Sequence, residues 1–286
     1  MHVNAQAEIP ALFDVTRRVF GPGIYDGIPL ETYHASAGIS SSGLKLIGRS
    51  PAHYAAEYIH GQRREPTPDM VLGSAAHALL ESESEFYRQF AVEPEGIDRR
   101  TTVGKAAWAA FTEIANGRTV IQGDTHSQVK AMVESVLAHP KAAALFSSGV
   151  AERSVYWTDA QSGILCKARP DYWRADLDLI VDLKTVRDAR PEPFRRQVIN
   201  YGYDLSAAFY LDGTAATRII WVAVEKTPPY AVACYLASPL FIERGRDHYR
   251  RHLDTYAACL AADLWPAYDT QITEIEPPMW ALRESL

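Results

Sequence analysis

Cysteine is scarce in this sequence of 286 residues, and long apolar runs are missing. The three cysteines are far apart, odd in number and in no Cys-x-x-Cys pair, which argues against a disulfide framework and against a zinc or iron–sulfur site. No run of about eighteen apolar residues predicts a membrane span. The first residues also lack the basic stretch and apolar core of a secretory signal. We therefore expect a cytoplasmic protein that has no membrane partner.

An excess of positive charge is also lacking, because the net charge is −6. That balance is not typical of a nucleic-acid-binding protein, but phosphate contacts depend on local charge and not on the total. Between positions 184 and 196 five basic residues face two acidic ones, Asp188 and Glu192. The basic residues are Lys184, Arg187, Arg190, Arg195 and Arg196. This segment is either a DNA-binding patch or an ordinary solvated face.

The chain shows no internal repeat, low-complexity tract or long linker, so we predict a single domain over residues 1–286. Residues 1–35 are expected to form an irregular lead-in, and residues 263–286 an irregular tail. Ser40–Ser42 should cap a helix that runs through Ile47, and Ser50-Pro51 should open the next one. Further helices are predicted over residues 69–83, 104–116, 125–138, 193–210 and 239–262.

Strands are predicted in the second half of the chain. Residues 154–157 and 164–169 should form a hairpin, and three more strands are expected over residues 179–184, 218–224 and 231–235. The segment between positions 184 and 218 contains a helix and could form a crossover on one face of a sheet. The sequence therefore predicts an α/β fold with a mixed central sheet flanked by helices.

The residues that best suggest chemistry are Asp171 and the triplet Asp182-Leu183-Lys184. Residues two apart in a strand share a face, so Asp182 and Lys184 should point the same way, with Leu183 in the core. Two aspartates could hold Mg²⁺ and so help to activate water against a phosphodiester. Lys184 could orient that water, assist its deprotonation or stabilise transition-state charge. The alternative is an exposed ion pair, but the apolar residues 179–181 favour a buried strand, where charges need a partner or a function.

Two further features could belong to the same site. His77 and Glu81 lie four apart on one helix face, and a neutral imidazole could be another metal ligand. A histidine packed in the core is the alternative. Lys167 and Arg169 alternate with Asp171 along a strand and could bind phosphates beside the metal. An ordinary exposed strand face would explain them equally well.

These pieces together resemble the PD-(D/E)xK nuclease superfamily, in its RecB-like branch, and most closely the RecE (exonuclease VIII) exonuclease domain of phages and prophages. The resemblance extends from about Tyr33 to the C-terminus, and the order and spacing of several short motifs make it specific. The motifs occupy residues 33–34, 38–44, 50–54, 72–79, 156–159, 166–171, 182–185, 265–266 and 280–281.

The resemblance implies a restriction-endonuclease-like core and a defined site. His77, Asp171, Asp182 and the backbone carbonyl of Leu183 would bind the metal, and Lys184 would be the catalytic lysine. The metal would be Mg²⁺, with Mn²⁺ able to substitute. Glu152 matches an acidic position of the family, but its role stays open.

One motif of the branch is altered in this chain. A Gln-x-x-x-Tyr motif usually follows the lysine, and here its place is taken by Ser206 and Tyr210, with serine in place of glutamine. A literal match begins nine residues earlier, at Gln197. We favour the later register, because the residues around Tyr210 resemble those of the family. Supporting or DNA-contacting roles are thus expected for Glu152, Lys167, Arg169, Arg195, Arg196, Ser206 and Tyr210.

The resemblance further implies a magnesium-dependent exodeoxyribonuclease that acts 5′-to-3′ on the ends of linear double-stranded DNA, in recombination or end resection. Such enzymes form homo-oligomers and work with a single-strand annealing protein. Two alternatives stay open: a single-strand or structure-specific nuclease with the same site, and an inactive DNA-binding module of the same fold. The intact Asp171, Asp182 and Lys184 argue against the inactive module.

Overall fold

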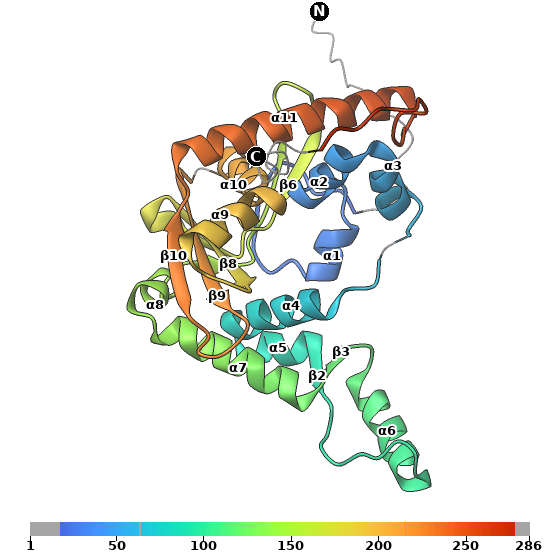
Figure 1. The fold of residues 1–286 in the computed structure, drawn as a ribbon, viewed down its shortest axis with the longest axis vertical. Helices are drawn as coiled ribbons and strands as arrows, with labels where there is room; N and C mark the ends of the chain where they lie inside the picture. Colours follow the sequence, from blue (N-terminus) through green and yellow to red (C-terminus); the bar gives the residue numbers. More distant parts are fainter. Residues whose placement is uncertain (1–17, 63, 215, 278–286) are drawn as a thin grey trace, which may run out of the picture.

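A five-stranded mixed sheet forms the centre of the protein (Figure 1). The structure is a computed structural model that describes residues 18–62, 64–214 and 216–277. The strand order is β10-β9-β8-β7-β4, in which β8 and β9 are parallel and the other pairs antiparallel. The strands are β4 (Val150–Ala151), β7 (Tyr172–Arg174), β8 (Leu179–Val186), β9 (Arg218–Glu225) and β10 (Val232–Leu236). The predicted α/β fold with a mixed central sheet is confirmed.

Strand β8 is buried because apolar side chains occupy both of its faces. Leu179, Val181 and Leu183 belong to one hydrophobic core, whereas Ile180 and Val186 belong to another on the opposite face. Asp182 and Lys184 occupy the same alternating positions as Ile180 and Val186. Leu183 is 1% exposed. The sequence prediction for the faces of this strand is therefore confirmed.

Two helices cross from β8 to the parallel strand β9, as the crossover prediction required. They are α9 (Pro191–Asn200) and α10 (Tyr203–Gly213), and they cover the face that carries Ile180. The prediction of one helix over residues 193–210 was wrong. Gly202 has φ of +60° and interrupts the helix, a conformation that glycine adopts without steric cost. The long helix α11 (Pro239–Ala262) packs along α10 (Figure 1).

The other face of the sheet is covered by α4 (Pro68–Glu81) and α7 (Gly123–Ala138). The predicted helix 69–83 ends earlier than expected, because Ser82 caps a separate helix, α5 (Glu83–Gln89). Its side-chain oxygen accepts a hydrogen bond from the Glu85 N–H at 3.0 Å. The next helix, α8 (Pro140–Phe146), lies near the edge of the sheet.

The predicted hairpin forms between β5 (Ser154–Thr158) and β6 (Leu165–Ala168), but outside the central sheet. With β1 (Gly23–Tyr25) it makes a separate three-stranded sheet. The expected irregular lead-in was therefore wrong over residues 23–35, where β1 and α1 (Leu30–Ala35) form. Residues 1–17 lie outside the described part.

The helices that follow begin at the predicted serine caps. Ser40 caps α2 (Ser41–Arg49), and Ser50 caps α3 (Pro51–Tyr54), which continues into a turn of π-helix over Ala55–Ile59. The caps are local features, since each side chain accepts a hydrogen bond from an N–H three residues ahead. Both helix starts could thus be predicted from neighbouring residues alone.

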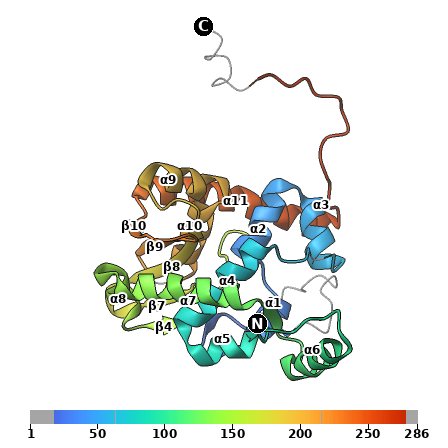
Figure 2. The ribbon, with the colours of Figure 1, turned by 60° about the horizontal axis from the view of Figure 1, so that its bottom comes forward.

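Helix α6 (Thr102–Ala115) stands away from the rest of the protein (Figures 1 and 2). It is joined to the body by the parallel pair β2 (Phe90–Val92) and β3 (Thr119–Ile121). After α11 the chain has no helix or strand over residues 264–277, as predicted for the tail. The motif at residues 280–281 lies outside the described residues. Among the described helices, none is both long enough and apolar enough to span a membrane.

Candidate metal centre and active site

Asp171 joins the elements of the candidate site. It directly precedes β7, and its Oδ2 accepts a hydrogen bond from the Leu183 N–H of β8 at 2.7 Å. The same oxygen lies 3.2 Å from Nδ1 of His77 on α4. Helix α4 can approach β8 because Gly73 faces Thr185, where a Cβ would lie only 3.3 Å from Oγ1. The fold thus brings His77 to Asp171 and the triplet of β8, from which it is distant in sequence.

Glu152 completes a group of possible metal ligands. His77, Glu152 and Asp171 each offer a ligand atom, and these atoms lie within 4.8 Å of one another. Glu152 follows β4 with φ of +50°, and its N–H donates to the Asp171 carbonyl at 3.0 Å. Glu81, one turn beyond His77, lines the same small cleft of about 80 Å³. The sequence identified Glu152 as an acidic position but did not indicate this place.

Asp182 and Lys184 form an ion pair beside this group. Asp182 is 4% exposed, and its Oδ2 lies 2.5 Å from the Lys184 ammonium. In this arrangement Asp182 faces the lysine, and the three clustered ligands are His77, Glu152 and Asp171. Lys184 also lies 4.9 Å from the centre of the Tyr203 ring, at the start of α10. The predicted same-face pair is therefore present and partly buried.

Without a bound cation, the buried carboxylates of the site are unfavourable in their charged form. Burial raises the pKa of Asp171 well above its usual range, and the nearby Asp182 and Glu152 raise it further. Burial likewise raises the pKa of Glu152 to about 7, against the opposing charge of Arg169. Burial and the charge of Lys184 lower the pKa of His77 to about 4, so its imidazole is neutral near pH 7.

This donor set fits a divalent cation. Crowded carboxylates and a neutral imidazole would both be stabilised by a bound positive charge. Carboxylate oxygens are the ligands that Mg²⁺ and Mn²⁺ prefer, and an imidazole nitrogen is a suitable further ligand for Mn²⁺. His77, Glu152 and Asp171 would hold the ion, and Asp182 lies close enough to raise the pKa of Asp171.

Helix α10 presents Tyr210, and not the earlier Tyr201, to this site. Burial raises the pKa of Tyr210, and the charges of Asp182 and Asp171 raise it further, so the phenol lies near both carboxylates. Tyr201 is 58% exposed. Ser206 is half-buried and one turn before Tyr210 on the same face of the helix. The later register of the glutamine–tyrosine motif, with Ser206 and Tyr210, stays a prediction.

The phosphate-binding role expected for Lys167 does not fit the structure. Lys167 is 3% exposed, and its ammonium donates to the carbonyl oxygens of Tyr33 at 2.8 Å and Ser36 at 2.7 Å. These carbonyls lie at the C-terminal end of α1, where a cation also interacts favourably with the helix dipole. The partners lie more than 130 residues away in sequence, so alternation along a strand could not reveal them.

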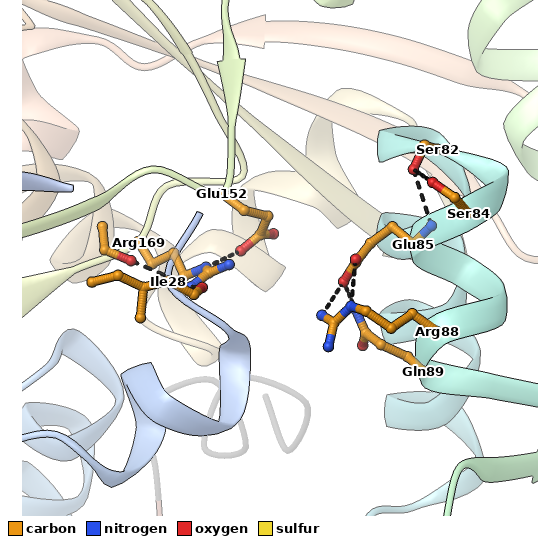
Figure 3. Close-up of polar contacts among 9 residues, drawn as sticks. Ile28, Ser82, Ser84, Glu85, Arg88, Gln89, Glu152 and Arg169 are labelled. Carbon is orange, nitrogen blue, oxygen red and sulfur yellow. Dashed lines mark hydrogen bonds and ion pairs between the residues drawn. The ribbon is translucent and has the colours of Figure 1, made fainter. Parts of the chain in front are cut away.

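Arg169 is also occupied within the protein (Figure 3). Its guanidinium donates to Glu152 Oε2 at 2.7 Å and to the Ile28 carbonyl at 2.7 Å. It therefore positions Glu152, in place of the phosphate contact that the sequence suggested. Across the view in Figure 3, Glu85 of α5 is held by Arg88 in the same manner.

The basic segment after β8 is exposed but partly neutralised. Arg195 and Arg196 are both exposed on α9, and Arg195 forms an ion pair with Glu192. Arg190 pairs with Asp188 at 2.6 Å. A DNA-binding role for Arg195 and Arg196 stays a prediction.

The fold and the site together define a class of protein. An aspartate before one strand and an Asp-x-Lys pair on the next, in a mixed sheet with a crossover of helices, form a PD-(D/E)xK arrangement. The chain belongs to the family described as PDDEXK-like domain of unknown function (DUF3799), whose profile matches residues 40–276. The expected superfamily membership is confirmed.

One solved structure agrees at the level of the fold, and two others show a weaker likeness. A protein of Eubacterium rectale, provisionally named an exonuclease, shares 14% identity over 91% of this chain and 99% of its own, with a TM-score of 0.60. A phage-related exonuclease of Haemophilus somnus is 11% identical over 67% of this chain and 95% of its own, with a TM-score of 0.34. An alkaline exonuclease of Laribacter hongkongensis is 12% identical over 58% of this chain and 88% of its own, with a TM-score of 0.28. No curated protein matches the chain in sequence.

Proposed function

We propose that this protein is a metal-dependent exodeoxyribonuclease that degrades linear double-stranded DNA from its ends, in the 5′-to-3′ direction, during recombination or end resection. Mg²⁺ would be the natural cofactor, and Mn²⁺ would substitute. The observation that carries the proposal is the ligand group His77, Glu152 and Asp171 beside the buried pair of Asp182 and Lys184. The exonuclease name given to the Eubacterium rectale protein, which has a similar fold, supports the choice of exonuclease over endonuclease.

The residues of the site have separate tasks in phosphodiester hydrolysis. A bound divalent ion supplies Lewis acidity, which polarises the phosphoryl oxygen and makes water a better nucleophile. His77, Glu152 and Asp171 would hold that ion, together with Asp182 and the Leu183 carbonyl. Although burial opposes its charge, Asp182 and Asp171 raise the pKa of Lys184. The lysine therefore stays protonated and stabilises the negative charge that develops on the phosphate.

The remaining parts of the proposal come from the superfamily resemblance. They are a homo-oligomeric assembly, a single-strand annealing protein as partner, a phage or prophage origin and a cytoplasmic location. The proposed substrate of the assembly is the end of a linear DNA duplex.

A digestion assay tests the proposal. Linear duplex with 5′-phosphates, labelled at either end, is incubated with Mg²⁺, with Mn²⁺ or with EDTA, alongside circular and single-stranded DNA. We expect metal-dependent release of nucleotides from linear duplex, with loss of the 5′ label first. A folded protein that leaves every substrate intact would refute the nuclease, and preference for single strands or circles would favour the structure-specific alternative.

Asp182→Asn and Lys184→Ala should each lower the rate by about 10²–10³-fold, because Asp182 helps to hold the ion and Lys184 stabilises the negative charge of the transition state. A matched control is Asp188→Asn, which alters an exposed ion pair of the same spacing, Asp188 with Arg190. The control should cleave at the wild-type rate. Near wild-type rates in Asp182→Asn or Lys184→Ala would show that the site is wrongly assigned.

A further inference from the structure

Lys45 on α2 lies beside the catalytic pair but has no acidic partner of its own within the described part of the chain. Its ammonium is 5.8 Å from the centre of the Tyr203 ring, and the Lys184 ammonium is 4.9 Å from the same ring. Two cations therefore share one aromatic side chain at the edge of the candidate site. Among the described residues, no ion pair or hydrogen bond involves the Lys45 ammonium.

The side chain of Lys45 is held in position by the elements around it. Ser41, one turn earlier on the same face of α2, lies close enough to Tyr210 of α10 to lower the pKa of its phenol, against the larger effect of burial. The stem of Lys45 lies against Gly202, where a Cβ would be only 3.3 Å from Cε of the lysine. Because Gly202 separates α9 from α10, the same break that ends α9 makes room for Lys45. This lysine is therefore placed by packing and differs from a mobile surface residue.

The electrostatic surroundings of Lys45 are unfavourable for a cation. Burial and the charge of Lys184 lower the pKa of Lys45 to about 8, against the opposing charges of Asp182 and Asp204. Each of these carboxylates is already paired, Asp182 with Lys184 and Asp204 with Arg244. A positioned ammonium beside another ammonium, without a carboxylate in contact, would be stabilised by an anion that arrives with the substrate.

We propose that Lys45 binds a non-bridging oxygen of the substrate phosphate next to the one that is cleaved. The proposal rests on the proposed nuclease function. Lys184, paired with Asp182, is placed for the phosphate that reacts, and Lys45 approaches the same Tyr203 ring from α2. Lys45 is thus a positioning residue that fixes the strand in register, and its loss should weaken DNA binding more than the chemical step.

The first test measures binding without cleavage. A fluorescent duplex with 5′-phosphates is titrated in EDTA at several salt concentrations with wild type, Lys45→Met and Lys45→Arg. Methionine keeps the packing of the stem against Gly202 and removes only the charge. We expect about a tenfold loss of affinity for Lys45→Met, a salt slope lower by about 0.7–0.9, and recovery in Lys45→Arg. Lys130→Met, at an exposed lysine of α7, should bind as the wild type does.

The second test identifies the phosphate. One uncharged methylphosphonate linkage is moved along the strand, and affinity is measured for wild type and Lys45→Met. At one position the neutral linkage should weaken the wild type about tenfold and leave Lys45→Met unaffected, because the interaction is already lost. Additive effects at every position, or wild-type affinity in Lys45→Met, would overturn the inference. If Lys45→Met does not fold, the absence of any sensitive position in the wild type would overturn it equally.

The two proposals fail in distinguishable ways. A wild type that binds DNA but never cleaves it with metal would refute the nuclease. A wild type that cleaves while Lys45→Met keeps its affinity and salt slope would refute only the role of Lys45. In steady-state digestion, Lys45→Met should raise KM about tenfold and change kcat by less than about threefold.

Discussion

Replacing Glu152 by glutamine should stabilise the metal-free protein at pH 8 and weaken its response to a divalent cation. Burial raises the pKa of Glu152 from 4.5 to about 7, although the charge of Arg169 opposes the rise. A shift of that size corresponds to roughly 3 kcal/mol in the free energy of unfolding. Because the side chain is 25% exposed, water reduces the effect, and we expect a gain of about 1–3 kcal/mol.

The sign of the pH dependence follows from the direction of the shift. A raised pKa means that the folded protein binds the proton more tightly than the unfolded chain does. The penalty for the Glu152 charge is therefore absent below pH 4.5, grows as pH rises and is complete above about pH 7. Glutamine carries no such charge, and its side-chain oxygen can still accept from Arg169. The stability difference between variant and wild type should thus shrink to under about 1 kcal/mol at pH 5.

Urea unfolding at pH 5 and pH 8, in EDTA and in Mn²⁺, measures these differences. At a Mn²⁺ concentration one hundred times its Kd, the wild type should gain about 2.7 kcal/mol. Glu152→Gln should gain less, because it lacks one ligand. The difference in unfolding free energy between Glu152→Gln and the wild type at pH 8 should therefore become smaller or change sign when Mn²⁺ is added.

Glu85 offers a matched control on α5. Its hydrogen bonds with Arg88 lower the pKa of Glu85, the opposite direction to Glu152. Glu85→Gln should thus destabilise the protein at pH 8 by under about 1 kcal/mol and leave its Mn²⁺ response unchanged. The reasoning is refuted if Glu152→Gln is less stable than the wild type in EDTA at pH 8. Equal stabilisation of Glu152→Gln and the wild type by Mn²⁺ would refute the assignment of Glu152 as a ligand.

Two further predictions concern other parts of the chain. Arg195→Ala combined with Arg196→Ala should weaken DNA binding and lower its salt slope by about 1–2, measured by fluorescence anisotropy, and an unchanged slope would assign these arginines to an ordinary solvated surface. Gly245→Ala should lower the unfolding free energy by about 1–3 kcal/mol in urea, because its Cβ would lie 2.0 Å from the Asp204 carbonyl oxygen where α11 crosses α10. Wild-type stability in that variant would show that the two helices separate easily.

The local features of this protein could be predicted from the sequence, because each depends on residues a few positions apart. Alternation along β8 placed Asp182 and Lys184 on one face and Leu183 in the core. The caps at Ser40 and Ser50 likewise depend on an N–H three residues ahead. The order of short motifs added the superfamily, and with it His77, which no local pattern could connect to a strand more than 100 residues away.

The tertiary structure decided what these residues contact. Alternation suggested that Lys167 and Arg169 both face the substrate, but the carbonyls of α1 and Glu152 occupy them. The place of Glu152 among the ligands and that of Lys45 beside Tyr203 also depend on segments that meet only after folding. The physical reason is common to all of them. Spacing along one strand or helix determines the direction of a side chain, whereas its partner and its charge state are determined by which distant elements pack against it.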